Sequence, residues 1–452
     1  MRRKRLTIAG IGALVVAAVT LVLLWPRDVP EPGKPGAAAV FDDPAAWRDV
    51  RWERIDPPSM GGQLTQSPVR IIRGGPGFIV LGRDAMGGEG REDTVAAIWT
   101  SNDGRDWAKH RLTEGVPPGD VAEIRLIAAG APGIVVAGGV CCTVEDPAMW
   151  WSADGASWER ITLPPDMQDV AFYDVEAGPG GFVVAGVSLV GNPNDPDEVA
   201  ELWTSPDGRS WSEVDPEAAG LGPGHVSDVT WTGDAWVAVG KQPGGETWDG
   251  AVWRSADGVA WDRIAVDDPS ITGPEEEELG RVFALEHGLV ALGGAGTHAD
   301  RQDCEGLLRG EGQRGPDIVG VADASLALSC GWLGEARWTS EDGSTWERAP
   351  DAPPDVGGRR LIEQRVIATG GPGLVVVGAE EPRRVVLGDH IGTWVSADGL
   401  TWGPVGLSPQ FPDGLILADI VVVGRTIVGI GDSEWDQPTG SDGVVWIGTV
   451  SP

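Results

Sequence analysis

The chain has 452 residues and a formal net charge of −34 at pH 7, with 68 Asp and Glu residues against 34 Lys and Arg residues. Phosphate binding needs clustered Lys and Arg side chains, so this charge balance argues against a nucleic-acid partner. The chain contains 68 Gly, 35 Pro and 22 Trp, and 41% of its residues are hydrophobic, so it has many turns and still buries a large core. Its length exceeds that of one ordinary domain unless the fold grows by adding repeated units.

The first 48 residues form three segments of different composition. Residues 1–5 include four basic residues, and residues 6–25 ("LTIAGIGALVVAAVTLVLLW") are uncharged and long enough to span a bilayer as a helix. Basic residues before such a helix stay in the cytoplasm, which predicts a single-pass cell-membrane anchor with the remaining chain outside. Residues 26–48, rich in Pro, Gly and Ala, predict an extended linker. Signal-peptide cleavage and secretion are the alternative, and the nearest small-residue triplet is at 37–39.

The four cysteines are expected to form disulfides, because disulfides persist outside the membrane. Cys304 and Cys330 bracket a long insertion that a bond between them would staple. Cys141 and Cys142 are adjacent, so they need a rare, strained vicinal bridge or other partners. Four cysteines allow three connectivities, and the sequence leaves all of them open. A metal site with His298 is the alternative for Cys304 and Cys330, but the C-x-x-C spacing is absent, and we predict no metal and no cofactor.

One nine-residue motif, which we call the box, occurs six times. The copies read "WTSNDGRDW" (99–107), "WWSADGASW" (150–158), "WTSPDGRSW" (203–211), "WRSADGVAW" (253–261), "WTSEDGSTW" (338–346) and "WVSADGLTW" (394–402). Their serines are 50 to 85 residues apart, a period typical of propeller blades or solenoid units. Between boxes, a glycine-rich turn joins two short β-branched runs, as in "GGPGFIVLG" (74–82), which predicts a hairpin.

Two hairpins per period supply the four strands of a propeller blade. The hairpins outside the boxes centre near residues 76, 132, 179, 233, 287, 372 and 424, which predicts seven blades. The longest interval contains one such hairpin (282–294), so it is one blade with an insertion at 297–334. The last blade ends at 443–450 without a fourth strand, whereas 49–56 ("DVRWERID") match the outer-strand pattern without a preceding hairpin. Pairing of these segments would close an all-β, seven-bladed propeller over 49–452 and remove its exposed edges.

The box resembles the Asp-box, or BNR, repeat of the sialidase-like propeller family, whose usual form is S-x-D-x-G-x-x-W. All six copies here read S-x-D-G-x-x-W, a shorter turn. The resemblance extends over about residues 50–450 and implies the propeller fold. It does not imply one activity, because the box occurs in enzymes and in binding proteins alike.

The chemistry of each box residue suits a structural role in the turn. The Asp carboxylate accepts backbone N–H groups within the turn, the Gly tolerates positive φ, and the Ser hydroxyl bonds locally. The Trp side chains bury apolar area between blades. Because catalysis needs a carboxylate once or twice and not in every blade, we predict a structural role for all six boxes. The residues are Ser101, Asp103, Gly104, Trp107, Ser152, Asp154, Gly155, Trp158, Ser205, Asp207, Gly208, Trp211, Ser255, Asp257, Gly258, Trp261, Ser340, Asp342, Gly343, Trp346, Ser396, Asp398, Gly399 and Trp402.

Ligands are expected on the face opposite the boxes, by the resemblance to other propellers. The loops on that face are 83–94, 139–148, 241–250, 295–336, 379–390 and 432–443. Trp248 and Trp435 are the aromatic residues there without a box role, and each either stacks on a sugar or peptide or covers a loop.

Four arginines, Arg70, Arg125, Arg281 and Arg365, fall near the start of four innermost strands. Guanidiniums that converge at the mouth of a channel would bind a carboxylate or sulfate through forked hydrogen bonds. In the alternative, each arginine pairs with a neighbouring acid such as Glu123 or Glu363.

The resemblance to sialidases implies a catalytic set of three arginines, a tyrosine nucleophile activated by a glutamate, and an acid–base aspartate. The single tyrosine is Tyr173, with Asp174 and Glu176 close behind it. The arginines for such a site would be Arg70, Arg125 and Arg365. The early F/Y-R-I-P signature of the family is absent, and "VRIIRGG" (69–75) is a poor substitute.

The balance of these features predicts a membrane-anchored, extracytoplasmic propeller that binds a glycan, a peptide or an envelope protein without catalysing a reaction. A sialidase-like or other glycoside hydrolase is the first alternative, since two suitably placed carboxylates suffice for that chemistry. A structural subunit of a membrane complex is the second alternative.

Overall fold

The computed structural model describes residues 47, 50–61, 65–85, 94–118, 120–141, 146–192, 195–245, 247–273, 275–296, 334–349, 355–356, 359–371, 373–381, 391–404, 416–433 and 442–450. The chain divides into two compact units, Met1–Pro30 and Glu31–Pro452, and every described residue lies in the second. The predicted cytoplasmic tail, anchor helix and nearly all of the linker lie outside the described residues. Within the described ranges no helix is long and apolar enough to cross a membrane.

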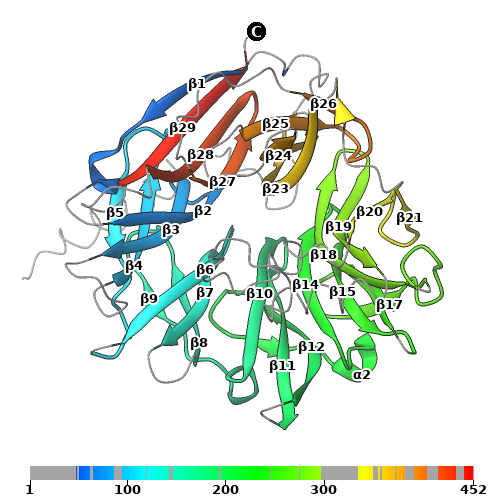
Figure 1. Ribbon diagram of the computed structural model, residues 1–452. Coiled ribbons are helices and arrows are strands. Elements are labelled where there is room, and N and C mark those ends of the chain that lie inside the picture. Colours follow the sequence, from blue (N-terminus) through cyan, green and yellow to red (C-terminus); the bar gives the residue numbers. More distant parts are fainter. Residues whose placement is uncertain are drawn as a thin grey trace, which may run out of the picture. The chain divides into compact units, whose positions relative to one another are not determined.

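The described residues form seven antiparallel sheets, which follow one another as blades around a ring (Figure 1). Blade 1 contains β2 (Gln66–Gly74), β3 (Gly77–Ala85), β4 (Thr94–Ser101) and β5 (Ala108–Arg111), and blade 2 contains β6 (Val121–Gly130), β7 (Gly133–Cys141), β8 (Asp146–Ser152) and β9 (Glu159–Arg160). Blade 3 contains β10 (Val170–Gly178), β11 (Gly181–Asn192), β12 (Asp195–Ser205) and β13 (Ser212–Glu213), and blade 4 contains β14 (His225–Trp231), β15 (Trp236–Pro243), β16 (Trp248–Ser255) and β17 (Trp261–Ile264).

The remaining blades complete the ring. Blade 5 contains β18 (Glu276–Leu285), β19 (Gly288–Gly296), β20 (Gly334–Ser340) and β21 (Glu347–Arg348). Blade 6 contains β22 (Asp355–Val356), β23 (Arg359–Gly370), β24 (Gly373–Glu381), β25 (Ile391–Ser396) and β26 (Trp402–Pro404), and blade 7 contains β27 (Ile416–Val423), β28 (Thr426–Ser433), β29 (Asp442–Val450) and β1 (Val50–Ile55). The innermost strands contact one another in the order β2, β6, β10, β14, β18, β23 and β27, and β27 contacts β2. The predicted seven-bladed propeller is therefore confirmed.

The ring closes through the two strands that the sequence analysis had left without hairpin partners. β1 pairs antiparallel with β29 in a register that runs from Val50↔Val450 to Ile55↔Val445. This confirms the predicted closure, in which the strand at 49–56 completes the last blade. Because β1 pairs along the outer edge of β29, the backbone N–H and C=O groups at that edge of β29 are not left without partners.

Blade 5 contains the longest break between strands, and blade 6 contains an additional strand. β19 and β20 pair from Leu289↔Ser340 to Ala295↔Gly334, so the strands before and after the predicted insertion belong to one blade. Blade 6 differs from the prediction, since it has five strands. The additional strand, β22, pairs only through Asp355↔Arg360 and Val356↔Arg359, at the start of β23 and along the edge opposite β24.

Each box forms a turn between the third and the fourth strand of its blade. In all six, the Ser Oγ accepts the N–H of the box Gly at 2.8–2.9 Å. The Asp Oδ1 accepts two further backbone N–H groups at 2.6–3.4 Å. The box Gly has a φ of 72–79°, the left-handed region that glycine adopts without strain. The carboxylates are thus engaged by their own turns.

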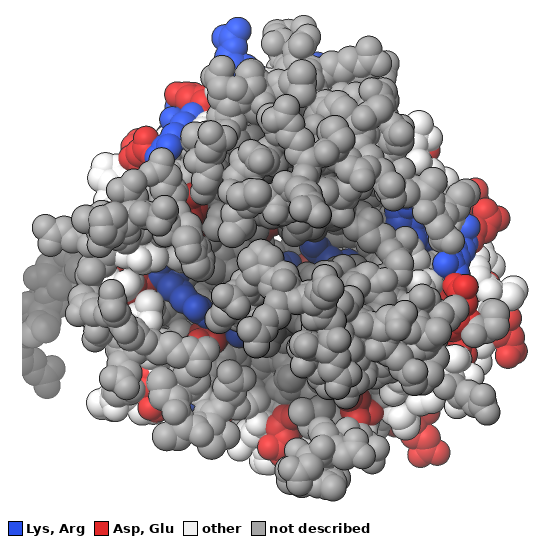
Figure 2. Space-filling model, in the orientation of Figure 1, with Lys and Arg blue, Asp and Glu red and all other residues white. Residues whose placement is uncertain are grey.

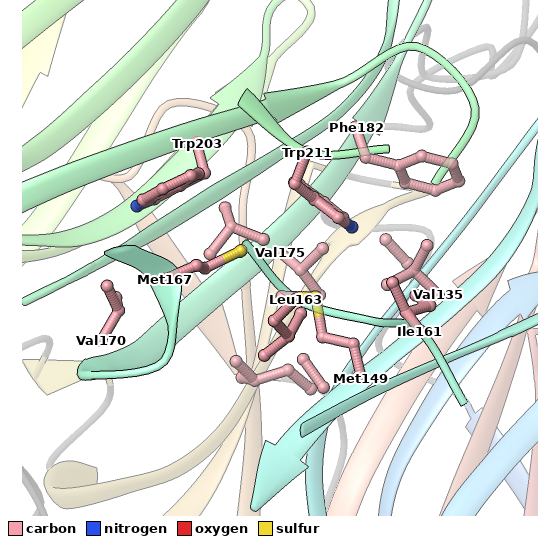
Figure 3. Packing of buried hydrophobic residues seen from close by; sticks show 14 of the residues in the cluster. Val135, Met149, Ile161, Leu163, Met167, Val170, Val175, Phe182, Trp203 and Trp211 are labelled. Atoms are coloured by element: carbon pink, nitrogen blue, oxygen red, sulfur yellow. The ribbon is translucent and has the colours of Figure 1, made fainter. Parts of the chain in front are cut away.

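The hydrophobic core consists of clusters between neighbouring blades. Figure 3 shows the cluster between blades 2 and 3, in which Trp203 and Trp211 of the third box lie with Phe182 against Val135 and Met149 of blade 2. Trp203 is 2% exposed and Trp211 is 7% exposed. Since an aromatic side chain buries about 150–250 Å², the tryptophans of the boxes account for a large share of the contact at every junction between blades except that of blades 6 and 7.

Trp47 belongs to this core, although the sequence analysis had assigned residues up to 48 to the linker. Its side chain is fully buried in the cluster between blades 6 and 7, with Val375, Val422 and Trp446. A Cβ atom added at Gly371 would overlap the Trp47 ring. The packed part of the chain therefore includes a residue that precedes β1.

Candidate functional site

The face opposite the boxes is called the mouth here. In every blade the innermost strand begins at this end, and the second strand returns to it, because the strands are antiparallel. The boxes follow the third strands and therefore lie at the other end of the ring. Parts of the predicted ligand loops, at 86–93, 142–145, 246, 297–333, 382–390 and 434–441, lie outside the described residues.

All seven innermost strands contain a β-bulge near the mouth. One residue of each strand is skipped in the pairing with its neighbour. These bulge residues are Val69, Arg125, Tyr173, Ser227, Gly280, Arg365 and Ala418, and β23 has a further shift at residue 362. A bulge redirects a side chain away from the regular alternation. Val69 and Tyr173 are accordingly 41% and 42% exposed although they lie on innermost strands.

The bulges separate the four predicted arginines into two pairs. Arg125 and Arg365 are bulge residues, whereas Arg70 and Arg281 follow a bulge by one position. Arg125 Nη2 lies 3.4 Å from Glu123 Oε2, which is the pairing with a neighbouring acid that the sequence left as the alternative. The side chain of Arg365 lies outside the described part. The structure therefore does not place the four arginines in equivalent positions.

Arg70 and Arg281 belong to a group of charged residues that we call the channel cluster. Its members are Arg70, Asp174, Glu176, Asp228, Arg281 and Asp419. Asp174, Asp228 and Asp419 take the position directly after the bulge in their strands, the same position as Arg70 and Arg281. The space-filling view is hollowed at the middle of the ring, and Lys or Arg atoms are visible inside the hollow (Figure 2).

Each of the three aspartates joins its own blade to the blade that follows it. Asp419 accepts the N–H of Ile71 at 2.9 Å. Asp174 accepts that of Val229 at 3.3 Å, and Asp228 accepts that of Val282 at 2.7 Å. Arg70 Nη2 also lies 4.0 Å from Asp174 Oδ1. These contacts make the channel cluster part of the blade packing and leave its acids close together.

Crowding of these acids alters their protonation. Burial raises the pKa of Glu176 to about 8, with repulsion from Asp174 adding to the effect and the charge of Arg70 opposing it. Burial and the neighbouring Asp174 likewise raise the pKa of Asp228 well above its ordinary value. For Asp419, burial raises the pKa although Arg70 opposes the shift. Glu176 is therefore mostly protonated at neutral pH, and the channel cluster carries less negative charge than its composition implies.

A second polar group, which we call the His225 clasp, lies at the mouth between blades 3, 4 and 5. His225 Nδ1 lies 3.2 Å from Glu198 Oε2, and its Nε2 lies 3.2 Å from Glu278 Oε1. Lys241 Nζ lies 3.5 Å from Glu278 Oε2. Glu198 comes from β12, His225 from β14, Lys241 from β15 and Glu278 from β18. One imidazole thus connects three consecutive blades.

The charges of the clasp stabilise one another. Burial opposes a charged His225, but its hydrogen bonds to Glu198 and Glu278 outweigh burial and raise the pKa of the imidazole. Burial would raise the pKa of Glu278, yet His225 and Lys241 lower it to about 2. The hydrogen bond from His225 also lowers the pKa of Glu198. Both glutamates are therefore ionised near neutral pH.

Tyr173 lies against the clasp. Its ring meets the His225 ring edge to face, with 5.4 Å between the centroids. Among the described residues it is the one exposed large aromatic side chain. Trp248, the other predicted aromatic that is described, is half-buried, and Lys241 Nζ lies 5.1 Å from its ring centroid. Trp248 therefore helps to position the clasp, and Tyr173 offers the exposed ring.

Other predicted site residues cannot be placed beside Tyr173. Trp435, Cys142, Cys304, Cys330 and His298 lie outside the described residues, as does the side chain of Cys141. The disulfides therefore remain predictions. Within the described ranges, no group of three or more His, Cys, Asp or Glu side chains is arranged to hold a metal ion.

The clasp, and Asp228 and Asp419 of the channel cluster, were not identified from the sequence. A signal for the channel aspartates was available, since "YDV", "SDV" and "ADI" place Asp174, Asp228 and Asp419 at a similar distance before the hairpin in three blades. No comparable signal marked the clasp. Its glutamates are 27 and 53 residues from His225, on other blades.

Comparison with known proteins finds similarity to solved structures alone. No family model and no curated protein matches the chain. Among solved structures, a mutant α-L-arabinofuranosidase from Fusarium graminearum bound to an iminosugar inhibitor is 12% identical, with 87% of this chain and 96% of that chain covered and a TM-score of 0.38. The β-propeller domain of the Trilobed protease from Pyrococcus furiosus is 10% identical, with coverages of 86% and 98% and a TM-score of 0.46.

A sialidase also appears among these structures. Trypanosoma rangeli sialidase in complex with sialic acid is 9% identical, with 88% of this chain and 59% of that chain covered and a TM-score of 0.41. The match thus spans about three fifths of the sialidase. These TM-scores are too low to transfer an activity, and membership of the Asp-box family is not shown.

Proposed function

We propose that the protein is a membrane-anchored, extracytoplasmic propeller that binds a glycan at the mouth of blades 3 to 5 without catalysing a reaction. The observation that carries the proposal is the exposed ring of Tyr173, which packs edge to face against the His225 ring of the clasp. An aromatic ring beside fixed polar side chains offers a sugar both apolar contact and directional hydrogen bonds. The hydrogen bonds of the clasp pre-organise this surface, which lowers the entropy that binding costs.

The contacts of the predicted sialidase residues favour binding over catalysis. Arg125 pairs with Glu123, and Arg70 lies among the carboxylates of the channel cluster. These two contacts oppose the three-arginine clamp that the resemblance implies.

A glycoside hydrolase remains the second candidate because of one specific observation. Glu176 has a pKa of about 8, so at neutral pH it keeps the proton that a general acid must donate. Asp174 lies two residues away on the same strand and would be the second carboxylate. This candidate predicts that Glu176→Gln abolishes the hydrolysis of a glycoside.

Replacing Tyr173 by alanine is expected to weaken glycan binding by at least about fivefold, since loss of a buried aromatic contact costs more than about 1 kcal/mol. The full chain in detergent micelles would be applied to an immobilised panel of neutral and acidic oligosaccharides, and the Kd for the best ligand would then be measured. Tyr173→Phe, which keeps the ring, is expected to retain most of the affinity. Val259→Ala, at a 60% exposed position in a box, is the control and should bind like the wild type.

Two results would contradict this proposal. Equal affinities of Tyr173→Ala and Val259→Ala would show that the glycan does not bind at Tyr173. Turnover of fluorogenic glycosides by the wild type, lost in Tyr173→Phe, would establish the hydrolase and identify the tyrosine hydroxyl as part of its chemistry.

The membrane anchor is part of the proposal and has its own test. Residues 6–25 are expected to remain attached, so the full chain should sediment with membranes and be extracted by detergent and not by carbonate at high pH. Protease added to intact cells should digest the propeller, because the basic residues 1–5 favour a cytoplasmic N-terminus. A mature protein in the medium that begins after residue 39 would instead show signal-peptide cleavage.

A further inference from the structure

We propose that the charge of His225 regulates the glycan site, such that loss of one proton opens the clasp, releases Glu198 and weakens binding at Tyr173. The inference rests on the proposed function for its consequence, but the switch itself can be measured without a ligand. The inference adds a pH dependence to the glycan site and assigns it to the imidazole of His225.

The geometry of His225 requires two ring protons. Each imidazole nitrogen lies 3.2 Å from an oxygen of a different glutamate. An ionised carboxylate only accepts hydrogen bonds, so each nitrogen must donate for both contacts to be favourable. A neutral imidazole has one N–H group, and its other nitrogen would then present a lone pair to a carboxylate. The two contacts are therefore compatible with imidazolium and not with the neutral ring.

The surroundings of His225 compensate its charge. Glu198 faces it from β12 and Glu278 from β18, while Lys241 from β15 binds the far oxygen of Glu278. Tyr173 from β10 covers it with an aromatic ring. The two glutamates balance the charges of His225 and Lys241, so the clasp has no net charge. The side chain of His225 is 8% exposed. Removing one proton leaves a buried excess of negative charge, which costs free energy.

The pH range in which the clasp is closed follows from the direction of each pKa shift. The pKa of His225 is raised above its ordinary 6.5, so its contribution to stability is fully present below pH 6.5 and is lost as the pH rises through the folded-state value. The pKa of Glu278 is lowered from 4.5 to about 2, so its contribution is present above pH 4.5 and is lost as the pH falls towards 2. The clasp is closed from about pH 4.5 to the raised pKa of His225 and opens on the alkaline side.

Glu198 is the partner that leaves on this alkaline side. Its side chain is 37% exposed, so water can solvate the released carboxylate. Glu278 is 21% exposed and keeps Lys241 as a second partner. Because Tyr173 packs against the imidazole edge to face, a change in the hydrogen bonds and tilt of His225 changes the environment of the tyrosine ring.

The chain contains one tyrosine, which makes the switch directly observable. The full chain would be produced in detergent micelles with ring-¹³C-labelled tyrosine, so that the labelled ring signals come from Tyr173 alone. An NMR titration between pH 5.5 and 9 is expected to show a sigmoidal change with a midpoint above 6.5. The range stops below about pH 10, where the phenol of tyrosine ionises in model peptides. A flat titration would overturn the proposal.

Matched variants assign the transition to His225. His225→Gln is expected to abolish it, whereas His287→Gln, at a side chain that is 88% exposed, should leave it unchanged. Glu198→Gln keeps the histidine and removes one ionised acceptor, so the midpoint should fall by roughly one pH unit. This variant keeps the test valid if His225→Gln does not fold. A midpoint unaffected by Glu198→Gln, or a transition that persists in His225→Gln, would contradict the assignment.

Binding measured across the same pH range separates the switch from the proposed function. With the best oligosaccharide from the panel, we expect affinity to fall at least threefold from pH 6 to pH 9 in the wild type and to remain flat in His225→Gln. A titrating Tyr173 signal with no glycan bound at any pH would refute the proposed function and leave the switch intact. Binding that is independent of pH, together with a titrating signal, would show that the switch does not regulate the site.

Discussion

Replacing Trp47 by alanine is expected to lower the free energy of unfolding by about 3–5 kcal/mol, the usual cost of removing a buried aromatic side chain. Trp47 is fully buried between blades 6 and 7, although it precedes the first strand. Trp47 packs in the cluster of blades 6 and 7, and blade 7 contains the β1–β29 pair that closes the propeller, so we expect loss of the indole ring to weaken this closure. Urea unfolding of the full chain in detergent, followed by tryptophan fluorescence, measures the change.

Two further variants show whether the effect of Trp47 comes from packing. Leu400→Ala removes an apolar side chain that is 46% exposed, and it should change the stability by less than about 0.5 kcal/mol. Gly371→Ala should be destabilising because its new methyl group would overlap the Trp47 ring. If Trp47→Ala is as stable as Leu400→Ala, Trp47 is not part of the folded core.

Replacing Glu176 by glutamine is expected to stabilise the protein at alkaline pH. The pKa of Glu176 rises from 4.5 to about 8 on folding, because burial and then Asp174 disfavour its charge. Between these values the folded chain keeps a proton that the unfolded chain has released, so the free energy of unfolding falls as the pH rises. Glutamine has no proton to lose, and at pH 9 the variant should be more stable than the wild type by roughly 1–3 kcal/mol.

The pH profile distinguishes this explanation from a general gain in stability. Below pH 4.5 the carboxyl of Glu176 is protonated in both states, so Glu176→Gln and the wild type should differ little there. Some pH dependence should remain in the variant, since burial also raises the pKa of Asp228 and of Asp419. Glu286→Gln, at an exposed position in a hairpin turn, is the control. An equal gain at all pH values would refute the role of ionisation.

The blades were predictable because their defining interactions are short in sequence. Ser205 and Asp207 bond to groups at most three residues away, so one box carries nearly all the information for its own turn. Six such boxes with the inner hairpins allowed the blades to be counted. Closure of the ring by Trp52 and its neighbours also followed from the count, because one strand lacked a hairpin and one blade lacked a strand.

The site was predicted only in part. Tyr173 was named from the sequence only as a possible sialidase-like nucleophile, and Trp248 as an aromatic residue of a ligand loop. The structure brings both to the clasp through His225 and Lys241. The sequence could not show whether the four arginines converge, because a bulge shifts by one residue which side chain points into the channel. Arg125 lies at its bulge and Arg70 lies after its own, so the two similar sequence positions have different environments.

The sequence by itself determined the all-β class, the number of blades and the pairing of the two chain ends, because these depend on local turns and on strand count. The tertiary structure alone decided which charged groups meet. Glu198, His225 and Glu278 come from three blades, and their hydrogen bonds exist only when the ring sets those blades side by side. The same holds for the channel cluster, where burial and mutual repulsion raise the pKa of Glu176. Such shifts depend on distance in space, which strand patterns do not encode.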